Sequence, residues 1–336
     1  MRRVQVDGIL FSHERFINRG FNQPAWVTRQ REKEGNTLTI ITTSIERTTR
    51  VLAIILVLTN LSQSQQTRAA QSDGASRYAR VDGIRVHYES HGTGREAIVL
   101  IHGWTCNLGF WKQQIPDLTK RARVVAIDLP GHGKSDKPKT AYTMDLFARA
   151  VDAVMQDAGV DRGVLVGHSM GTPVARQFSR KYPQKTLGLV VVDGPLRPFG
   201  DKKMMDDFIA PLRGPDYKTQ AGQFIDGMLG PQVSAALREQ IKTSMLSTPQ
   251  YVAISAMEGM NEESNWKQDK IDVPVLAVLA KSPFWPADNE QFFRSVAPKL
   301  DYQMWDGVSH FLMMEKPKEF NAAVIAFVDK RALLKK

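Results

Sequence analysis

The sequence GHSMG at residues 167–171 decides the fold, because it stands between a short apolar run at 163–166 and a helical pattern at 172–182. The run GVLV is typical of a buried strand. A Gly-x-Ser-x-Gly pattern between a strand and a helix predicts a nucleophile elbow, a sharp turn that exposes the serine hydroxyl above a sheet. The two glycines leave room for this turn, since they carry no Cβ. Ser169 is therefore the candidate nucleophile, and an idle serine in a glycine-rich turn is the alternative.

The chain after residue 76 alternates apolar strands with helical segments. An Asp-Gly pair at 82–83, between two alternating segments, predicts a β-hairpin. Further strands are predicted at 97–101, 123–128, 189–193, 275–279 and 302–305, and helices at 143–158 and 320–333. This alternation predicts an α/β fold, with a mostly parallel sheet and helices on both faces.

The composition is that of an ordinary globular protein, with 336 residues, 42% of them apolar and 24% charged. The formal net charge is +10, but half of it falls on residues 1–70 and the rest is spread along the remaining chain. A nucleic-acid-binding face would need clustered basic residues, so no nucleic-acid partner is expected. Cys106 is the single cysteine. We expect it to be a small buried hydrophobe, with a reactive thiol as the alternative.

Residues 1–70 are predicted to be a disordered leader that contains a signal-like segment at 46–70. There a basic flank precedes an apolar run at 51–58, and polar and small residues follow it, which is the layout of a secretory signal peptide. Because the segment begins far from Met1, we expect translation to start at residues 38–46. The protein is then expected to be exported, periplasmic or secreted. The apolar run is too short for a stable membrane span, and a membrane anchor is the alternative.

Between residues 195 and 269 the alternation stops and several helical segments follow, which predicts a helical cap over the sheet. Methionine side chains are flexible and polarisable, so they suit a pocket for varied apolar groups. The alternative is that they only pack the cap onto the body. The cap contains six of them: Met204, Met205, Met228, Met245, Met257 and Met260.

Four motifs together resemble the alpha/beta hydrolase family over about residues 78–336. They are HGW at 102–104, DLPGHGKS at 128–135, the elbow, and GVSHF at 307–311. The resemblance implies a mostly parallel eight-stranded sheet with helices on both faces and a cap after the sixth strand. The hydrolase core would comprise residues 76–194 and 270–336, with the cap at 195–269. It also implies a catalytic triad in the chain order Ser, acid, His.

The resemblance assigns roles to four of these residues. Ser169 would be the nucleophile, and His310 would accept its proton and pass it to the leaving group. The oxyanion hole would consist of the backbone N–H groups of Trp104 and Met170. His168 is expected to pack or hydrogen-bond beside the elbow and to take no part in the chemistry.

The acid of the triad is where this chain departs from the commoner family pattern. That pattern puts an aspartate about three residues beyond the seventh strand, but residues 280–285 contain no carboxylate. Asp288 comes later, at a predicted helix start where an acidic residue is expected for the helix dipole alone. A minority of the family, including some haloalkane dehalogenases, places the acid after the sixth strand, where this chain has Asp193. We favour Asp193, and Asp288 is the alternative.

A serine nucleophile argues against haloalkane dehalogenase or epoxide hydrolase chemistry, which uses an aspartate in this family. We expect a serine hydrolase that cleaves a carboxylic ester, lactone or thioester of a small apolar substrate through an acyl-enzyme. The alternatives are a cofactor-free haloperoxidase or perhydrolase, a carbon–carbon bond hydrolase on the same triad, and a non-catalytic binding protein. No cofactor or metal is expected, since the histidines lack ligand spacing.

Aromatic residues of the loops are expected to line an apolar substrate pocket. The principal ones are Trp285, Phe284 and Phe311, and Trp104, Phe110 and Trp111 lie near the same loops.

Overall fold

The computed structural model describes residues 74–335, so the predicted leader and its signal-like segment at 46–70 lie outside the described residues. Within the described part, no helix is long and apolar enough to cross a membrane. Eight strands form one sheet in the order β1-β2-β4-β3-β5-β6-β7-β8, as the family resemblance implies. The strands are β1 (Ser76–Val81), β2 (Ile84–His91), β3 (Glu96–Ile101), β4 (Arg123–Ile127), β5 (Arg162–His168), β6 (Thr186–Val192), β7 (Val275–Ala280) and β8 (Leu300–Trp305).

The sheet is antiparallel at one edge and parallel elsewhere. Strand β2 pairs antiparallel with both β1 and β4, whereas β4, β3, β5, β6, β7 and β8 pair in parallel. The predicted hairpin joins β1 to β2 through Asp82 and Gly83, which both have positive φ, as a two-residue hairpin turn demands. Strands β3, β4, β5 and β7 are buried almost throughout, which explains their continuous apolar sequences.

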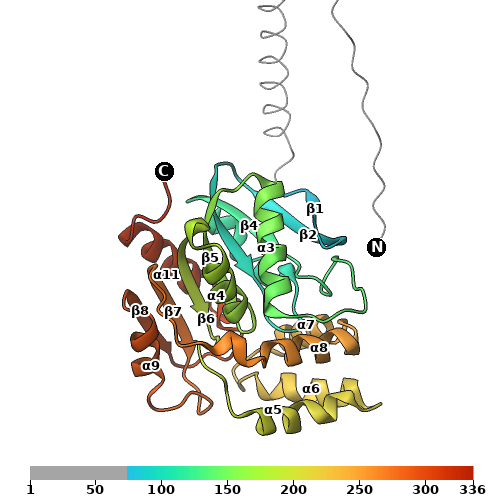
Figure 1. Cartoon of the computed structure of the whole chain (residues 1–336). Helices are drawn as coiled ribbons and strands as arrows, with labels where there is room; N and C mark the ends of the chain where they lie inside the picture. The colour runs from blue at the N-terminus through green and yellow to red at the C-terminus, as the bar shows by residue number, and fades with distance from the viewer. Residues whose placement is uncertain (1–73, 336) are drawn as a thin grey trace, which may run out of the picture. The chain divides into compact units, whose positions relative to one another are not determined.

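Helices cover both faces of the sheet, and Figure 1 shows α3 and α4 on its near face and α11 on its far face. Thr143 caps α3 by accepting a hydrogen bond from the Leu146 N–H, and Gly159 ends the helix in the left-handed conformation. The helices of the body are η1 (Leu108–Trp111), α2 (Ile115–Leu118), α3 (Met144–Ala158), α4 (Gly171–Lys181), η2 (Pro183–Lys185), α9 (Asn289–Val296), α10 (Leu312–Glu315) and α11 (Pro317–Lys330).

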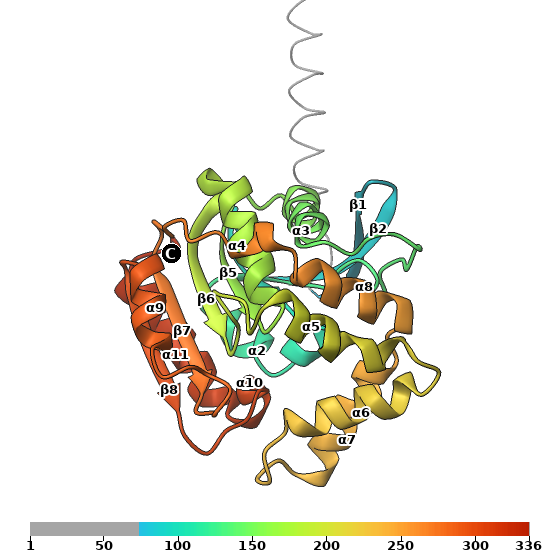
Figure 2. The same ribbon diagram turned by 60° about the horizontal axis from the view of Figure 1, so that its bottom comes forward.

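A second group of helices lies between β6 and β7 in the sequence, where the cap is predicted. Figures 1 and 2 show α5 to α8 gathered at one end of the sheet. Its helices are α5 (Lys202–Ile209), η3 (Ala210–Arg213), α6 (Tyr217–Gly227), α7 (Ala235–Leu246), α8 (Gln250–Met260) and η4 (Glu263–Trp266).

One buried arginine of α4 holds both ends of this helical segment. The Arg176 guanidinium donates to the carbonyl of Leu196 at 2.7 Å, where the segment begins, and to those of Lys267 at 2.5 Å and Asp269 at 3.1 Å, where it ends. Burial lowers the pKa of Arg176 to about 10, so the side chain remains charged at neutral pH. Its three carbonyl partners provide the polar environment that a buried charge requires.

Strand β5 and helix α4 approach so closely at the elbow that only glycine fits on either side of it. A Cβ on Gly167 would lie 2.3 Å from the carbonyl oxygen of Gly171, and one on Gly171 would lie 2.4 Å from that of Ile101. Both distances are far below a normal contact, and the opposing atoms belong to rigid backbone. The two glycines of the motif are therefore required for close packing of the elbow against β3.

This packing predicts the effect of Gly171→Ala, which we expect to lower the free energy of unfolding by about 1–3 kcal/mol through overpacking. Gly227 is the matched control, because it is also a helical glycine and a Cβ there meets no heavy atom within 4 Å. Gly227→Ala should not lower stability, since alanine is the better helix former. Urea unfolding of both variants measures the difference, and equal stabilities would contradict the packing argument.

Candidate active site

The elbow holds Ser169 in a conformation that exposes its hydroxyl. Ser169 follows β5 directly and has a φ of 52°, in the left-handed region that a residue with a side chain rarely occupies. Its N–H donates to the carbonyl of Val192 at 2.9 Å, and its carbonyl accepts from the N–H of Thr172 at 2.9 Å. The hydroxyl itself makes no hydrogen bond with any residue that the structure describes. It is therefore free to react with a molecule in the adjoining cavity.

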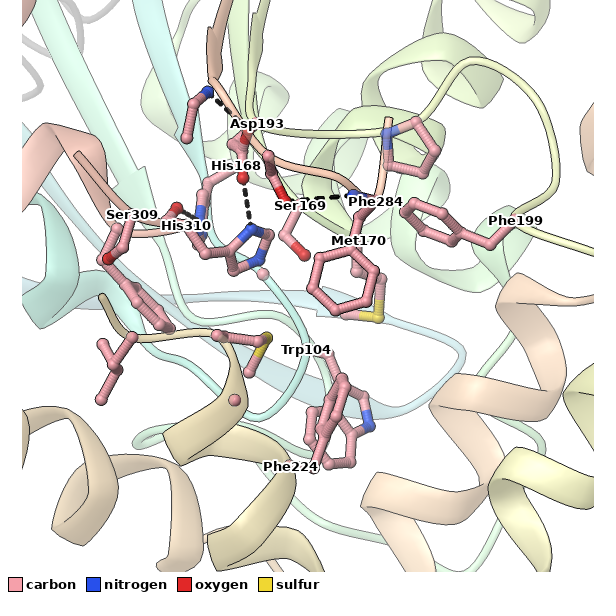
Figure 3. Close-up of a pocket in the computed structure, with 18 of the residues that line it drawn as sticks. Trp104, His168, Ser169, Met170, Asp193, Phe199, Phe224, Phe284, Ser309 and His310 are labelled. Carbon is pink, nitrogen blue, oxygen red and sulfur yellow. Dashed lines mark hydrogen bonds and ion pairs between the residues drawn. The ribbon is translucent and has the colours of Figure 1, made fainter. Parts of the chain in front are cut away.

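The imidazole of His310 is bonded to a carboxylate on its far side. Its Nδ1–H donates to Oδ2 of Asp193 at 2.7 Å. Because a carboxylate only accepts, the proton belongs on Nδ1, which leaves the lone pair of Nε2 available as a base. Figure 3 shows the Ser169 side chain beside this imidazole, at the same cavity. Catalytic hydrogen bonds to a serine are often long without substrate and shorten when it binds.

The structure brings one of the two candidate acids to His310. Asp193 follows β6 directly, has a φ of 42° and is buried. Asp288 instead precedes α9, with its carboxylate 60% exposed and paired with the Arg197 guanidinium at 2.5 and 3.0 Å. The location of Asp288 at a helix start agrees with the sequence, and of the two candidate acids only Asp193 bonds to His310.

Two backbone N–H groups at the site are free to bind an anion. Trp104 and Met170 are buried, line the same cavity as Ser169, and donate no backbone hydrogen bond to any described residue. Unpaired N–H groups are rare in protein interiors, so a pair of them beside a serine is a functional signal. Trp104 is held by its indole N–H, which donates to the carbonyl of Ala253 in α8 at 2.7 Å. Thr105, with a φ of 55°, turns the chain sharply after it.

The side chain of His168 contacts both the backbone and the ring of His310. Its Nε2–H donates to the backbone carbonyl of His310 at 2.9 Å, and the two rings lie 4.8 Å apart. Burial, and then the proximity of His310, hold the pKa of His168 well below its ordinary value, so the ring is neutral. The side chain packs and hydrogen-bonds beside the elbow, as the sequence predicts.

These groups face an apolar cavity of about 570 Å³. All six methionines of the cap line it, together with the predicted Trp285, Phe284, Phe311 and Trp104. Phe110 and Trp111 were expected near the same wall, but they are buried in the core, where Phe110 packs behind Phe311 at 5.8 Å. Cys106 is buried as expected, and burial raises the pKa of its thiol, which keeps it protonated. The described residues include no cluster of three metal-ligating side chains.

The sequence did not indicate Phe224 as a residue of the cavity, and it did not indicate the backbone contact that Met228 makes. The ring of Phe224, in α6, packs edge-on against Trp104 at 5.5 Å, and the carbonyl of Met228 accepts from the backbone N–H of His310 at 3.3 Å. Both contacts join the cap to the body across long stretches of chain. No local pattern in the sequence indicates such contacts.

A hydrogen-bonded series of a serine, a histidine and an aspartate also lies outside this cavity. The Ser76 hydroxyl is 2.9 Å from Nε2 of His87, whose Nδ1 is 2.7 Å from Oδ2 of Asp128. Burial opposes ionisation of Asp128, but hydrogen bonds from His87 and from the N–H groups of Leu108 and Lys134 lower its pKa. Ser76 does not line the cavity of Ser169. These three hydrogen-bonded residues therefore connect the hairpin to the turn after β4, and their serine does not face the apolar cavity.

Comparison with known proteins places the chain in a family. The model of the alpha/beta hydrolase fold matches residues 96–317, most of the chain, which therefore belongs to that family. The acetyltransferase component of an acetoin cleaving system from Cupriavidus necator is 39% identical over 126 residues, 37% of this chain and 34% of that protein. A 2-hydroxy-6-oxononadienedioate/2-hydroxy-6-oxononatrienedioate hydrolase from Burkholderia vietnamiensis is also 39% identical over 128 residues, 35% of this chain and 44% of that protein.

This chain thus matches less than half the length of these two relatives. Among solved structures, Est816, described as an N-acyl homoserine lactone degrading enzyme, is 27% identical with a TM-score of 0.64. That match covers 75% of this chain and 100% of Est816. It covers about twice the share of this chain that either of the two sequence matches covers.

The different surroundings of Ser169 and Ser76 predict which of the two serines reacts with a fluorophosphonate probe. We expect the probe to label Ser169, because free N–H groups beside it can hold the phosphonyl oxygen. Ser169→Ala should abolish labelling. Ser76→Ala, which removes the hydroxyl bonded to His87, should leave labelling intact. Peptide mapping of the labelled protein identifies the site. Labelling at Ser76, or labelling that survives Ser169→Ala, would contradict this assignment.

Proposed function

We propose that the protein is a serine hydrolase that cleaves a carboxylic ester, lactone or thioester of a small apolar substrate. The observation that carries the proposal is the hydrogen bond of His310 to Asp193 beside an unbonded Ser169 hydroxyl, at a cavity with two free N–H groups. Nucleophile, base, orienting acid and oxyanion donors are the parts that acyl transfer requires. Membership of the hydrolase family supports the same function.

In the proposed mechanism, Ser169 Oγ attacks the carbonyl carbon while Nε2 of His310 takes the hydroxyl proton. The carbonyl oxygen becomes an oxyanion and accepts hydrogen bonds from the N–H groups of Trp104 and Met170. One such donor contributes roughly 3 kcal/mol to stabilising the transition state. His310 then gives its proton to the leaving oxygen or sulfur, and the acyl-enzyme forms. Water repeats the sequence with His310 as base, which releases the acid and restores Ser169.

The cavity supports an apolar acyl or alcohol group as the part of the substrate that is bound. Six cap methionines line its wall, and thioethers adapt to irregular apolar groups at little cost. Lys281 lies at the wall, and its ammonium pairs with the exposed carboxylate of Asp306 at 2.9 Å. The similarity to Est816 supports lactones among the substrates to be tried.

A series of p-nitrophenyl esters from acetate to decanoate tests this function directly. We expect an optimum at intermediate chain length, because a cavity of about 570 Å³, lined in part by cap side chains, has room for more than an acetyl group but for only a limited length of acyl chain. Ser169→Ala should lower kcat by at least ~10³-fold, since no nucleophile remains. Steady-state rates of the folded wild type and variant decide the matter. Hydrolysis that is unaffected by Ser169→Ala, or no hydrolysis of any ester, lactone or thioester tried, would refute the proposal.

The assignment of the acid is tested by Asp193→Asn and Asp288→Asn on the best ester of that series. Asparagine at 193 cannot hold His310 in the required tautomer, so kcat should fall roughly 10³- to 10⁴-fold. Asp288→Asn removes an exposed ion pair, which contributes little to stability, and should change kcat less than about twofold. Circular dichroism confirms that both variants fold. A large loss in Asp288→Asn alone would transfer the role to that residue.

A further inference from the structure

The carboxylate of Asp193 receives a hydrogen bond from a side chain outside the proposed triad. The indole Nε1–H of Trp285 donates to Oδ1 at 3.3 Å, and the N–H of Ala280 donates to the same oxygen at 2.8 Å. His310 occupies Oδ2. We propose that Trp285 is a positioning residue, which orients the Asp193 carboxylate toward His310 and moderates its negative charge. The inference rests on the proposed function, since it concerns the same acid and base.

The sheet topology explains why a residue of this loop reaches Asp193. Strands β6 and β7 are adjacent and parallel, with Val192 opposite Val278, so the loops that follow them leave the sheet side by side. The loop after β7 is the one where the commoner family pattern places the acid, and here residues 280–285 contain none. The acid stands one strand away, after β6, and two N–H donors reach it from this side, one from Ala280 at the end of β7 and one from Trp285 in the loop that follows.

Trp285 is fixed well enough to direct the carboxylate. Its backbone N–H donates to the carbonyl of Ser282 at 3.2 Å, which closes a turn at the end of β7. Its ring packs against that of Phe199, from the segment that leads into α5, with 5.8 Å between the ring centroids. The indole is half-buried at the wall of the cavity. The indole of Trp285 thus contacts Asp193 through its N–H and contacts Phe199, near the start of the cap, through its ring.

The buried position of Asp193 makes these donors consequential. The residue is 5% exposed, and an ionised carboxylate with so little water depends on hydrogen bonds from the protein. A donor on Oδ1 stabilises the anion and draws charge away from Oδ2. Without the indole N–H, Oδ2 would hold a protonated His310 more strongly. The protonated form of the imidazole would then be favoured, and less of His310 would be in the neutral form that can accept a proton.

The sharpest test replaces Trp285 with benzothienylalanine, which keeps the bicyclic shape but has sulfur in place of the N–H. The matched control places the same analogue at Trp305, whose indole N–H donates to Oε1 of Gln303 at 3.0 Å, away from Asp193. Trp285→Phe gives a genetically simpler version. All are made in the full chain and compared with wild type by NMR titration of the His310 imidazole and by the pH dependence of ester hydrolysis.

We expect the analogue at 285 to move the titration midpoint of His310 and the acid limb of kcat/KM to higher pH together. It should also lower kcat by roughly tenfold, the effect of losing one hydrogen bond to a charged group, with KM nearly unchanged. The analogue at 305 should behave as wild type. A midpoint that does not move, or a loss of activity confined to KM, would show that Trp285 only lines the cavity and would overturn the proposal.

The two readouts separate this inference from the proposed function. The NMR titration needs no substrate, so a shifted midpoint without ester hydrolysis would uphold the role of Trp285 and refute the substrate class. Ester hydrolysis that depends on Ser169, with an unshifted midpoint, would uphold the function and refute the positioning role.

Discussion

The close approach of β5 to α4 at Ser169 is the constraint on which the rest of the site depends. Because glycine alone fits at 167 and 171, the chain turns within one residue and forces Ser169 to a φ of 52°. The N–H of Ser169 then meets the carbonyl of Val192, the last residue of β6. Asp193 follows β6 directly, so the bond that fixes Ser169 also fixes where the carboxylate of Asp193 can lie. A wider turn would leave the positions of Ser169 and Asp193 less well fixed.

Hydrogen-bond geometry alone does not make an active site, and this chain illustrates the difference. Ser76, His87 and Asp128 are bonded in the same order and at similar distances as a catalytic triad. Ser76, however, lies in a regular strand, paired with Glu89 of β2. The chemistry proposed for Ser169 needs three further things: an exposed hydroxyl on a strained turn, unpaired N–H groups, and an apolar cavity. The structure provides these around Ser169.

Sequence analysis predicted what local patterns determine and left open what tertiary contacts decide. Strands, helices and the elbow follow from periodicity and glycine spacing, and the structure confirms the fold class. The choice between Asp193 and Asp288 stayed open, because both follow strands or precede helices and only folding shows which one meets His310. Phe110 was expected at the cavity because it is aromatic and near a loop, but its short helix turns it into the core. The bond of Trp285 to Asp193 joins residues 92 positions apart, and no local signal marks it.

The cap and Ser169, the proposed nucleophile, are attached to the same helix. Arg176 lies in α4, which begins two residues after Ser169, and its guanidinium binds the carbonyls at both ends of the cap segment. The ends of the cap are therefore fixed relative to the elbow, while its interior wall consists of flexible methionine side chains. For the proposed hydrolase, we expect a fixed frame with a flexible methionine lining to let the shape of the cavity change with the substrate while the positions of Ser169, His310 and Asp193 stay constant. Changes of substrate range are therefore expected to arise from substitutions in the methionine wall, and changes of rate from substitutions in the frame.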